Sequence, residues 1–396
     1  MRPIRLSIAL SVFALAACSA AGSDAAVESG NSAAAPASAG GKPFQVQSLA
    51  QFQEPWAMAF LPGNGRRALV TEKTGRLLLW TEGGEPVTVA GVPEVDHGGQ
   101  GGLGDVAIHP KFAQNGLVYL SWAEAGPGDT RGAAVGRGRL IFTSAASAGA
   151  PAGARLEGFE VIWRQSPKVE GRGHFSHRIA FSPDGHLFIS SGERQKFTPA
   201  QDMNANLGKI VRLNDDGSVP RDNPFAARGG VAAQIWSFGH RNILGLAFAP
   251  DGRLWENEMG PKGGDELNLV ERGSNYGYPI VSNGDHYDGK DIPDHSTRPE
   301  FNAPEVSWTP VISPSSMIFY TGSQFRDWRG SALIGGLSSK ALIRVAISGN
   351  GAREAERFDM GQRIREVEQG PDGAIYLLED QTGGSGGRLL RLTPAR

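Results

Sequence analysis

The sequence contains one cysteine among 396 residues, and its positive and negative charges are nearly balanced. Without a second cysteine no disulfide can form within the chain, so the core alone must stabilise the fold. A formal net charge of −2 gives no electrostatic case for binding nucleic acid. Glycine is abundant at 55 residues, proline reaches 25, and 40% of the residues are hydrophobic. This composition excludes disorder over most of the chain and favours many short strands joined by tight turns.

The single cysteine, Cys18, follows an N-terminal export signal. Residues 1–17 place two arginines before an apolar run, which is the form of a bacterial signal peptide. The sequence Leu-Ala-Ala-Cys at 15–18 resembles the lipobox of bacterial lipoproteins, in which the cysteine is lipidated. An ordinary cleaved signal with a chance cysteine is the alternative. Residues 18–42 are small and polar without periodicity and predict a flexible tether, so residues 43–396 are left to form the folded domain.

These N-terminal features predict where the protein resides. Acyl chains on Cys18 would anchor the chain to a membrane without spanning it. By the same resemblance, Ser19 after the cysteine favours the outer membrane. We therefore expect a periplasmic, lipid-anchored protein of a Gram-negative-type bacterium.

A phrase of the type Ala-Phe-x-Pro-Asp-Gly-x-Leu-aromatic recurs along the rest of the chain. Each copy has the pattern of a strand, a Pro/Asp/Gly turn and a second strand, which together make a hairpin. Six copies at intervals of roughly 50–70 residues indicate a repeat architecture, and long helical patterns are absent. The prediction is an all-β fold, a six-bladed β-propeller of four-stranded antiparallel blades, with functional residues before or between the turns. The copies begin at Ala59, Ala107, Ala180, Ala247, Ile318 and Pro371.

Two glycine-rich motifs match known signatures only in form. Gly99–Gly104 reads GxGxxG, but the residues that follow are strand-like and Pro110 ends them, whereas a dinucleotide fingerprint must open a helix. Gly383–Gly387 reads GxSxG without the strand–turn–helix context of a catalytic serine. No CxxCH haem motif is present. Nucleotide, haem and serine-hydrolase chemistry are therefore not expected.

The densest stretch of polar and glycine residues is 239–268. It combines an Arg-Asn pair, a Gly-Pro step and an Asp-Glu pair. Backbone carbonyls and carboxylates at this spacing suit a hard cation, and a fixed guanidinium suits an anionic oxygen. The stretch therefore predicts part of a cofactor site.

Several motifs occur in the order found in one family. They are Gly99-Gln100-Gly101-Gly102-Leu103, His174-Phe175-Ser176-His177-Arg178, Gly192-Glu193-Arg194, Gly208–Asn214 followed by Asp222-Asn223-Pro224-Phe225, Gly239-His240-Arg241-Asn242, Gly260-Pro261 to Asn268, Asn275-Tyr276-Gly277 and Arg363-Ile364-Arg365. The chain resembles, over nearly its whole mature length, the soluble quinoprotein glucose dehydrogenase and aldose sugar dehydrogenase family. That resemblance implies a propeller that uses pyrroloquinoline quinone (PQQ) and calcium to oxidise aldose sugars at the anomeric carbon to lactones.

The resemblance assigns the general base to His174, which takes the proton of the anomeric hydroxyl. An imidazole suits this role because it is neutral near pH 7, and Glu193 is the carboxylate that could orient it. Arg241, with Asn242, is the candidate to contact the quinone oxygen that gains negative charge. No cytochrome is fused to the chain, so a separate quinone or cytochrome is expected to accept the electrons.

Further residues are candidates to hold the cofactor and the metal. Arg363 and Arg365 are two residues apart, which places both guanidiniums on one face if they lie on a strand. The resemblance further implies Gln100 at the cofactor edge, calcium on the carbonyls of Gly260 and Pro261, and a second calcium site at Glu266 and the Tyr276 carbonyl. Trp308 is either a stacking wall for sugar or a core residue.

The chain departs from the family pattern at several positions. Ser338 stands where a lysine is common, and Lys340, two residues on, would face the same side of a strand and replace it. Met259 precedes the Gly-Pro step, where histidine or glutamine is frequent in the family. Gly173 precedes His174, where the glucose dehydrogenase branch has an acid. His177 stands where a glycine is usual and could narrow the substrate pocket. Two alternatives stay open: a calcium-dependent propeller lactonase or hydrolase, and a catalytically inactive glycan-binding propeller. His97, His109 and His240 are expected to be packed or exposed without a special role, and the same interpretation is the alternative for His177.

Overall fold

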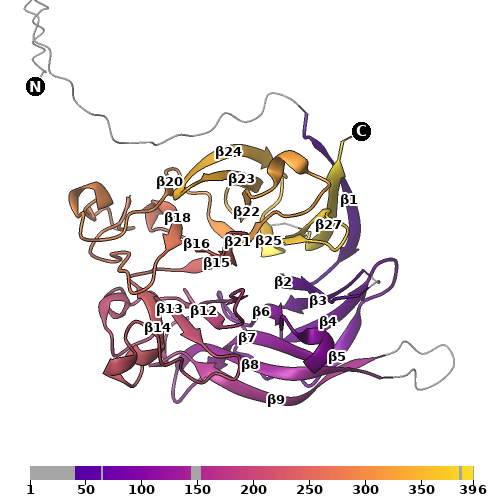
Figure 1. The fold of residues 1–396 in the computed structure, drawn as a ribbon, viewed down its shortest axis with the longest axis horizontal. Helices are drawn as coiled ribbons and strands as arrows, with labels where there is room; N and C mark the ends of the chain where they lie inside the picture. The colour runs from indigo at the N-terminus through magenta and orange to yellow at the C-terminus, as the bar shows by residue number, and fades with distance from the viewer. Residues whose placement is uncertain (1–40, 64–65, 144–152, 383–385, 396) are drawn as a thin grey trace, which may run out of the picture. The chain divides into compact units, whose positions relative to one another are not determined.

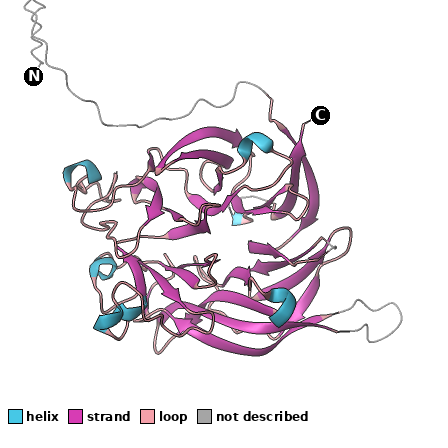
Figure 2. Ribbon diagram, viewed as in Figure 1, coloured by secondary structure: helices cyan, strands magenta, loops and turns pink. Residues whose placement is uncertain are grey.

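The computed structural model describes residues 41–63, 66–143, 153–382 and 386–395. The predicted signal peptide, Cys18 and nearly all of the predicted tether lie outside these residues. Strands make up most of the described chain, and helices are confined to short turns (Figure 2). None of the described helices is long and apolar enough to cross a membrane.

The strands form six four-stranded antiparallel blades, as the repeated hairpin phrase predicts, and a short parallel pairing of their outer strands joins the first two blades into one sheet. The first blade contains β2 (Pro55–Phe60), β3 (Arg67–Glu72), β4 (Arg76–Thr81) and β5 (Val87–Ala90). The second contains β6 (Leu103–Ile108), β7 (Leu117–Ala125), β8 (Thr130–Phe142) and β9 (Ala154–Arg164), with β10 (Val169–Glu170) paired to β8. The third contains β11 (Ser176–Phe181), β12 (Leu187–Ser191), β13 (Lys209–Leu213) and β14 (Ile235–Phe238).

The other three blades follow the same pattern. The fourth contains β15 (Ile243–Phe248), β16 (Leu254–Glu258), β18 (Asp265–Val270) and β20 (Val306–Trp308), beside a small ladder of β17 (Lys262–Gly263) and β19 (Gly284–Asp285). The fifth contains β21 (Pro314–Phe319), β22 (Ala332–Gly336), β23 (Ala341–Ser348) and β24 (Gly351–Asp359). The sixth contains β25 (Ile364–Gln369), β26 (Ile375–Glu379) and β27 (Arg388–Pro394), and its outer strand is β1 (Phe44–Gln51).

The described helices are single turns between strands. They are α1 (Phe112–Asn115) and the 3₁₀ turns Thr198–Gln201, Ala226–Arg228, Ala232–Gln234, His295–Thr297 and Arg326–Trp328. The GxGxxG motif at 99–104 leads into β6 and not into a helix. This outcome agrees with its exclusion as a nucleotide fingerprint.

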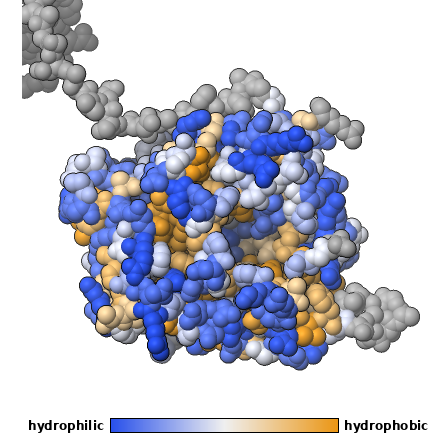
Figure 3. All heavy atoms as spheres, viewed as in Figure 1, coloured by the Kyte–Doolittle hydropathy of each residue, from blue (hydrophilic) through white to orange (hydrophobic). Residues whose placement is uncertain are grey.

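The blades close into a ring. The first strands contact one another in the order β2, β6, β11, β15, β21, β25 and again β2. They surround the centre in Figure 1, with β1, β9 and β24 toward the rim. The space-filling view from the same side shows a recess near the middle of the ring (Figure 3).

The apolar core lies between neighbouring blades. One cluster combines Trp56 and Leu69 of the first blade with Leu120 and Trp122 of the second, all nearly inaccessible to solvent. Another joins Trp255 of the fourth blade to Ile334 of the fifth. Each sheet buries both faces against its neighbours, which explains why many strands are apolar throughout and do not alternate.

Antiparallel order fixes which connections share an end of the ring. The Pro/Asp/Gly turns join the first and second strands of each blade at one end. The connections between second and third strands, and those between successive blades, lie together at the opposite end, here called the site end. Lys340 lies in such a connection, between β22 and β23, and has a left-handed backbone (φ 52°). The prediction that Ser338 and Lys340 share one face of a strand is therefore wrong, because the chain turns there.

Candidate active site

The connections at the site end carry most of the residues that the sequence analysis selected. His174 precedes β11, Glu193 follows β12, and Arg241 lies between β14 and β15. The other selected residues at this end are Gln100, Asn242, Gly260, Pro261, Lys340, Arg363 and, at the start of β25, Arg365. Glu266 lies near the start of β18, and the long segment with Tyr276 returns to this end because β19 pairs with β17.

A cavity of about 220 Å³ brings four of these residues together, namely His174, Glu193, Arg241 and Pro261. Its other lining residues were not selected from the sequence. They are Gln195, Phe197, Tyr278, His286, Tyr287 and Asp288. Gln100, Asn242, Lys340 and the two arginines of the sixth blade do not line this cavity.

His174 and Glu193 form a buried pair in the wall of this cavity. The Nδ1 atom of His174 lies 2.5 Å from Oε1 of Glu193, and the second carboxylate oxygen accepts the backbone N–H groups of Lys196 and Phe197 at 2.5 and 2.7 Å. An ionised carboxylate only accepts hydrogen bonds, so the His174 ring carries its proton on Nδ1 and leaves a lone pair on Nε2. This is the tautomer that a general base requires.

The protonation of the pair follows from burial. Burial lowers the pKa of His174 below 6.5, although the hydrogen bond with Glu193 opposes this shift. Burial also disfavours the ionised form of Glu193, but the hydrogen bonds from His174 and Phe197 leave the carboxyl pKa below its ordinary value. The pair is therefore a neutral imidazole beside a carboxylate at neutral pH.

The backbone around His174 is strained, and neighbouring side chains hold it. The φ values of His174, Ser176 and His177 are 48°, 58° and 58°. Residues other than glycine rarely adopt this left-handed region. The amide oxygen of Gln100 accepts the His174 N–H at 2.7 Å. The guanidinium of Arg194 lies 3.8 Å above the Phe175 ring and donates to the carbonyls of residues 173, 131 and 171. Arg194 was seen in the sequence only as part of a motif, without a role.

Arg241 is fixed at its backbone by a buried carboxylate. Oε2 of Glu258 accepts the N–H groups of Arg241 at 2.5 Å and Asn242 at 3.1 Å. The guanidinium donates to the carbonyls of Met259 and Gly260 at 2.8 and 2.6 Å, while its Nε atom is buried without a hydrogen-bond partner. The Asn242 side chain is fully buried and accepts from Ser176 at 3.2 Å.

The two arginines of the sixth blade do share one side, as their spacing predicts. Arg363 lies just before β25 and Arg365 within it, and both guanidiniums contact Oδ2 of Asp380, at 3.1 and 2.8 Å. Burial raises the pKa of Asp380, but the charge of Arg365 outweighs it and brings the pKa to about 2. Asp380 was not selected from the sequence. No motif marks it.

A second, smaller cavity has room for one water or ion, about 10 Å³. All four predicted metal residues line it: Gly260, Pro261, Glu266 and Tyr276. The Tyr276 carbonyl also accepts a hydrogen bond from Nε2 of His295 at 3.1 Å. Carbonyl and carboxylate oxygens around so small a space form a donor set that suits one hard cation.

Two side chains considered for the substrate pocket, Trp308 and His177, lie in the core. Trp308 is 4% exposed in the core between the fourth and fifth blades, and its indole donates to Glu354 at 2.7 Å, so it is not a sugar wall. The aromatic residues at the cavity are Phe197, Tyr278 and Tyr287, the last being 74% exposed.

His177 does not narrow the pocket, because its ring turns into the interior. It stacks on Trp56 with ring centroids 5.1 Å apart, and Nδ1 lies 2.8 Å from the Ser121 hydroxyl. Burial, reinforced by the charge of Arg178, lowers its pKa to about 3, so the ring is neutral. Gly104 provides the space for this ring, since a Cβ there would overlap the imidazole.

The fold and the cavity define a class of protein, a six-bladed propeller enzyme. Its site combines an imidazole–carboxylate pair, a fixed guanidinium and a second, smaller cavity at the predicted metal residues. A family model described as Glucose / Sorbosone dehydrogenase matches residues 52–391. The chain therefore belongs to the glucose/sorbosone dehydrogenase family and is a sugar oxidoreductase by that membership.

Similar proteins agree with this assignment. The chain is 40% identical over 352 residues to aldose sugar dehydrogenase YliI of Escherichia coli, covering 87% of this chain and 91% of that protein. A crystal structure of a glucose dehydrogenase superposes with a TM-score of 0.81 at 43% identity, covering 89% of this chain and all of the other. The PQQ-bound aldose sugar dehydrogenase of Streptomyces coelicolor gives 0.68 at 26% identity, covering 88% and 98%.

Proposed function

We propose that the protein oxidises aldose sugars at the anomeric carbon to lactones, with PQQ and calcium as cofactors. The observation that carries the proposal is the buried His174–Glu193 pair facing the same cavity as Arg241. Family membership supports sugar dehydrogenase chemistry, and a PQQ-bound structure among the similar proteins supports the choice of cofactor.

The donor groups at the site end suit a flat, anionic quinone. PQQ when bound supplies the oxidising group that accepts the hydride of the sugar. The buried Nε of Arg241 lacks a hydrogen-bond partner, which leaves a donor for a ligand oxygen. We assign the contacts with the carboxylates and ring oxygens of PQQ to Gln100, Arg241, Asn242, Lys340, Arg363 and Arg365. Calcium would be held by Gly260 and Pro261, with Glu266 and Tyr276 available for a second ion.

The chain's own residues then divide the work of the reaction. Nε2 of His174 takes the proton of the anomeric hydroxyl as the C–H bond breaks. Glu193 stabilises the imidazolium that results and keeps the ring in the required orientation. Arg241 donates to the oxygen on which negative charge develops. The proton is thus held on His174 while the two electrons leave with the hydride.

The partners follow from this chemistry. We infer that the electrons pass to a quinone or a cytochrome separate from the matched domain at residues 52–391. With Cys18 lipidated, the propeller would work from the periplasmic side of the outer membrane on a tether. Mass spectrometry of the mature N-terminus tests the anchor, and an unmodified peptide that begins beyond Cys18 excludes it.

The test of the function is reconstitution. Apo protein receives PQQ and CaCl₂, and reduction of an artificial dye is followed with a panel of aldoses and, separately, hydrolysis of lactones. Sugar-dependent reduction that falls in His174→Ala supports the proposal. Lactone hydrolysis without dye reduction identifies the hydrolase, and folded protein without either activity identifies a binding propeller. Each of the last two results overturns the proposal.

A further inference from the structure

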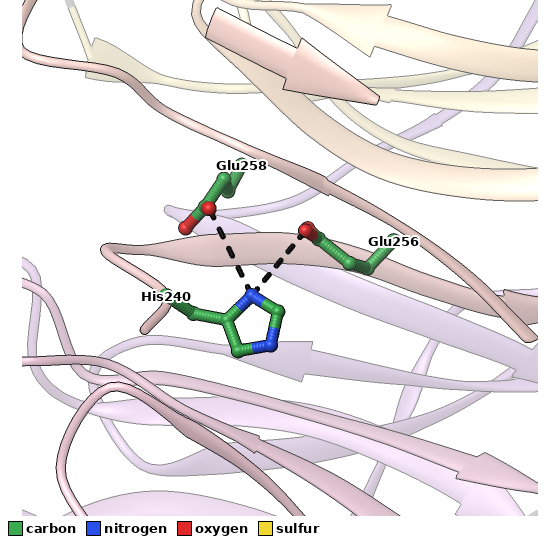
Figure 4. A group of neighbouring side chains, drawn as sticks. All are labelled: His240, Glu256 and Glu258. Atoms are coloured by element: carbon green, nitrogen blue, oxygen red, sulfur yellow. Dashed lines mark ion pairs between the residues drawn. The ribbon is translucent and has the colours of Figure 1, made fainter. Parts of the chain in front are cut away.

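A second cluster of chemically reactive side chains lies beneath the site, on the fourth blade. His240 stands in the connection between β14 and β15, and Glu256 and Glu258 project from the same face of β16 because they are two residues apart. Their exposed fractions are 1%, 0% and 3%. Figure 4 shows both carboxylates directed at the same ring nitrogen of His240.

The spacing of these groups is too wide for hydrogen bonds. Nδ1 of His240 lies 3.5 Å from Oε1 of Glu256 and 3.8 Å from Oε1 of Glu258. The three ligand atoms lie within 4.8 Å of one another. An ion bound at about 2.1 Å to an imidazole nitrogen and a carboxylate oxygen holds these atoms about 3.0–3.5 Å apart, so a small contraction completes the site.

Several polar atoms of these residues and of the neighbouring Asn268 are buried without hydrogen-bond partners. Nδ1 of His240 and the second oxygen of Glu256 are buried and have no hydrogen bond, and the same is true of the amide oxygen of Asn268. The other ring nitrogen, Nε2 of His240, lies 2.8 Å from the Ser237 hydroxyl, which fixes the ring. A buried histidine oriented through one nitrogen, with the other free, is the usual arrangement of a metal ligand.

No lysine or arginine among the described residues forms an ion pair with the carboxyl groups of this cluster. Burial lowers the pKa of His240, but Glu256 and Glu258 outweigh it and raise the pKa to about 9, so a bound metal ion would take the place of the ring proton. Glu256, Glu258 and Glu266 are buried together, and the Asn268 amide contacts both Glu256 and Glu266, at 2.7 and 3.2 Å. Removing carboxylates from water without a cation is costly, so a bound cation would stabilise this arrangement.

We propose that His240, Glu256 and Glu258 bind a divalent transition-metal ion, with zinc as the probe. The imidazole ligand argues against calcium, which takes oxygen ligands, and mixed imidazole and carboxylate ligands suit zinc. The ion fastens β16 to the connection that carries Arg241, because the other oxygen of Glu258 already holds the N–H groups of Arg241 and Asn242. Its role is structural, and the site adjoins the small cavity at Gly260 and Pro261, because Glu258 also lines that cavity.

The experiment measures metal content directly. Purified full-length protein is stripped with EDTA, reloaded with CaCl₂ and then with ZnCl₂, dialysed, and analysed by mass spectrometry of its metals. We expect about one retained zinc per chain in the wild type and in Glu266→Gln, which alters the candidate calcium cavity, and less than about a tenth in Glu256→Gln. Cobalt in place of zinc should give a visible absorption band that shows nitrogen and oxygen ligation.

The outcomes are decisive in either direction. Wild-type protein that retains no zinc and shows no cobalt band overturns the proposal, as does zinc retained equally by wild type and Glu256→Gln. If Glu256→Gln fails to fold, the cobalt spectrum of the wild type still decides, because a band without imidazole character also overturns it. None of these measurements depends on dye reduction, so the proposed function stands or falls separately.

Discussion

Replacing Glu193 with glutamine tests the most specific feature of the candidate active site. One carboxylate oxygen lies 2.5 Å from Nδ1 of His174, and the other accepts two backbone N–H groups, those of Lys196 and Phe197. In the glutamine variant the amide oxygen must occupy the position that accepts the N–H groups of Lys196 and Phe197, because an NH₂ group in that position would face two donors. The NH₂ group then points at Nδ1 of His174 and forces the ring proton onto Nε2.

The magnitude follows from the loss of the base. With the proton on Nε2, His174 has no lone pair to offer the sugar hydroxyl. General-base catalysis contributes about 10²–10⁴ in rate, so kcat should fall by that factor, which corresponds to about 2.7–5.4 kcal/mol. KM should change little, because the side chain keeps its volume and both backbone hydrogen bonds.

The assay is steady-state dye reduction by protein reconstituted with PQQ and calcium. Glu160→Gln is the matched control, since Glu160 forms an exposed ion pair with Arg137 on the outer strand of the second blade. That variant should keep wild-type activity. A Glu193→Gln enzyme with normal thermal stability and more than about a third of the wild-type kcat would refute the assigned tautomer, and with it the role of His174 as base.

Two further predictions concern pH and packing. Burial lowers the pKa of His174 below 6.5, so the imidazole is mostly neutral at pH 6.5. The acidic limb of the pH profile of kcat/KM should therefore lie below pH 6.5, and a limb above pH 7 would contradict this pKa direction. Gly104→Ala should destabilise the fold by about 1–3 kcal/mol, because its Cβ overlaps the His177 ring. Adding His177→Gly should recover part of that loss in urea unfolding; purely additive effects would show that the two sites do not interact.

The fold was predictable because its signal is repeated. Each copy of the turn phrase predicts one hairpin, and the six copies together predict six blades. The pairing of β1 with β27 was not predictable, because residues 44–51 carry no turn phrase and their partner lies at the other end of the chain. Local chemistry cannot specify a contact of that separation.

The site was predictable only in part. Residues in dense motifs, such as His174, Glu193 and Arg241, meet at one cavity because loops from successive blades share the site end. The direction of a side chain is set by tertiary packing, so the sequence left open whether Trp308 and His177 face the pocket or the core, and both turn into the core. The phrase Gly-His-Arg-Asn likewise gave no sign that His240 faces two buried glutamates, since Glu256 looks like an ordinary strand residue.

The closure of the sixth blade has a consequence for how the protein reaches its native state. The pair that joins Phe44 to Pro394 can form only after the last strand of the chain has been synthesised. Until then β1 has no partner strand, and the sixth blade consists of β25 and β26 alone. Such late, long-range pairing makes folding slow and leaves strand edges exposed in the incomplete chain. A ring of this design therefore remains unfinished until its last strand has been made.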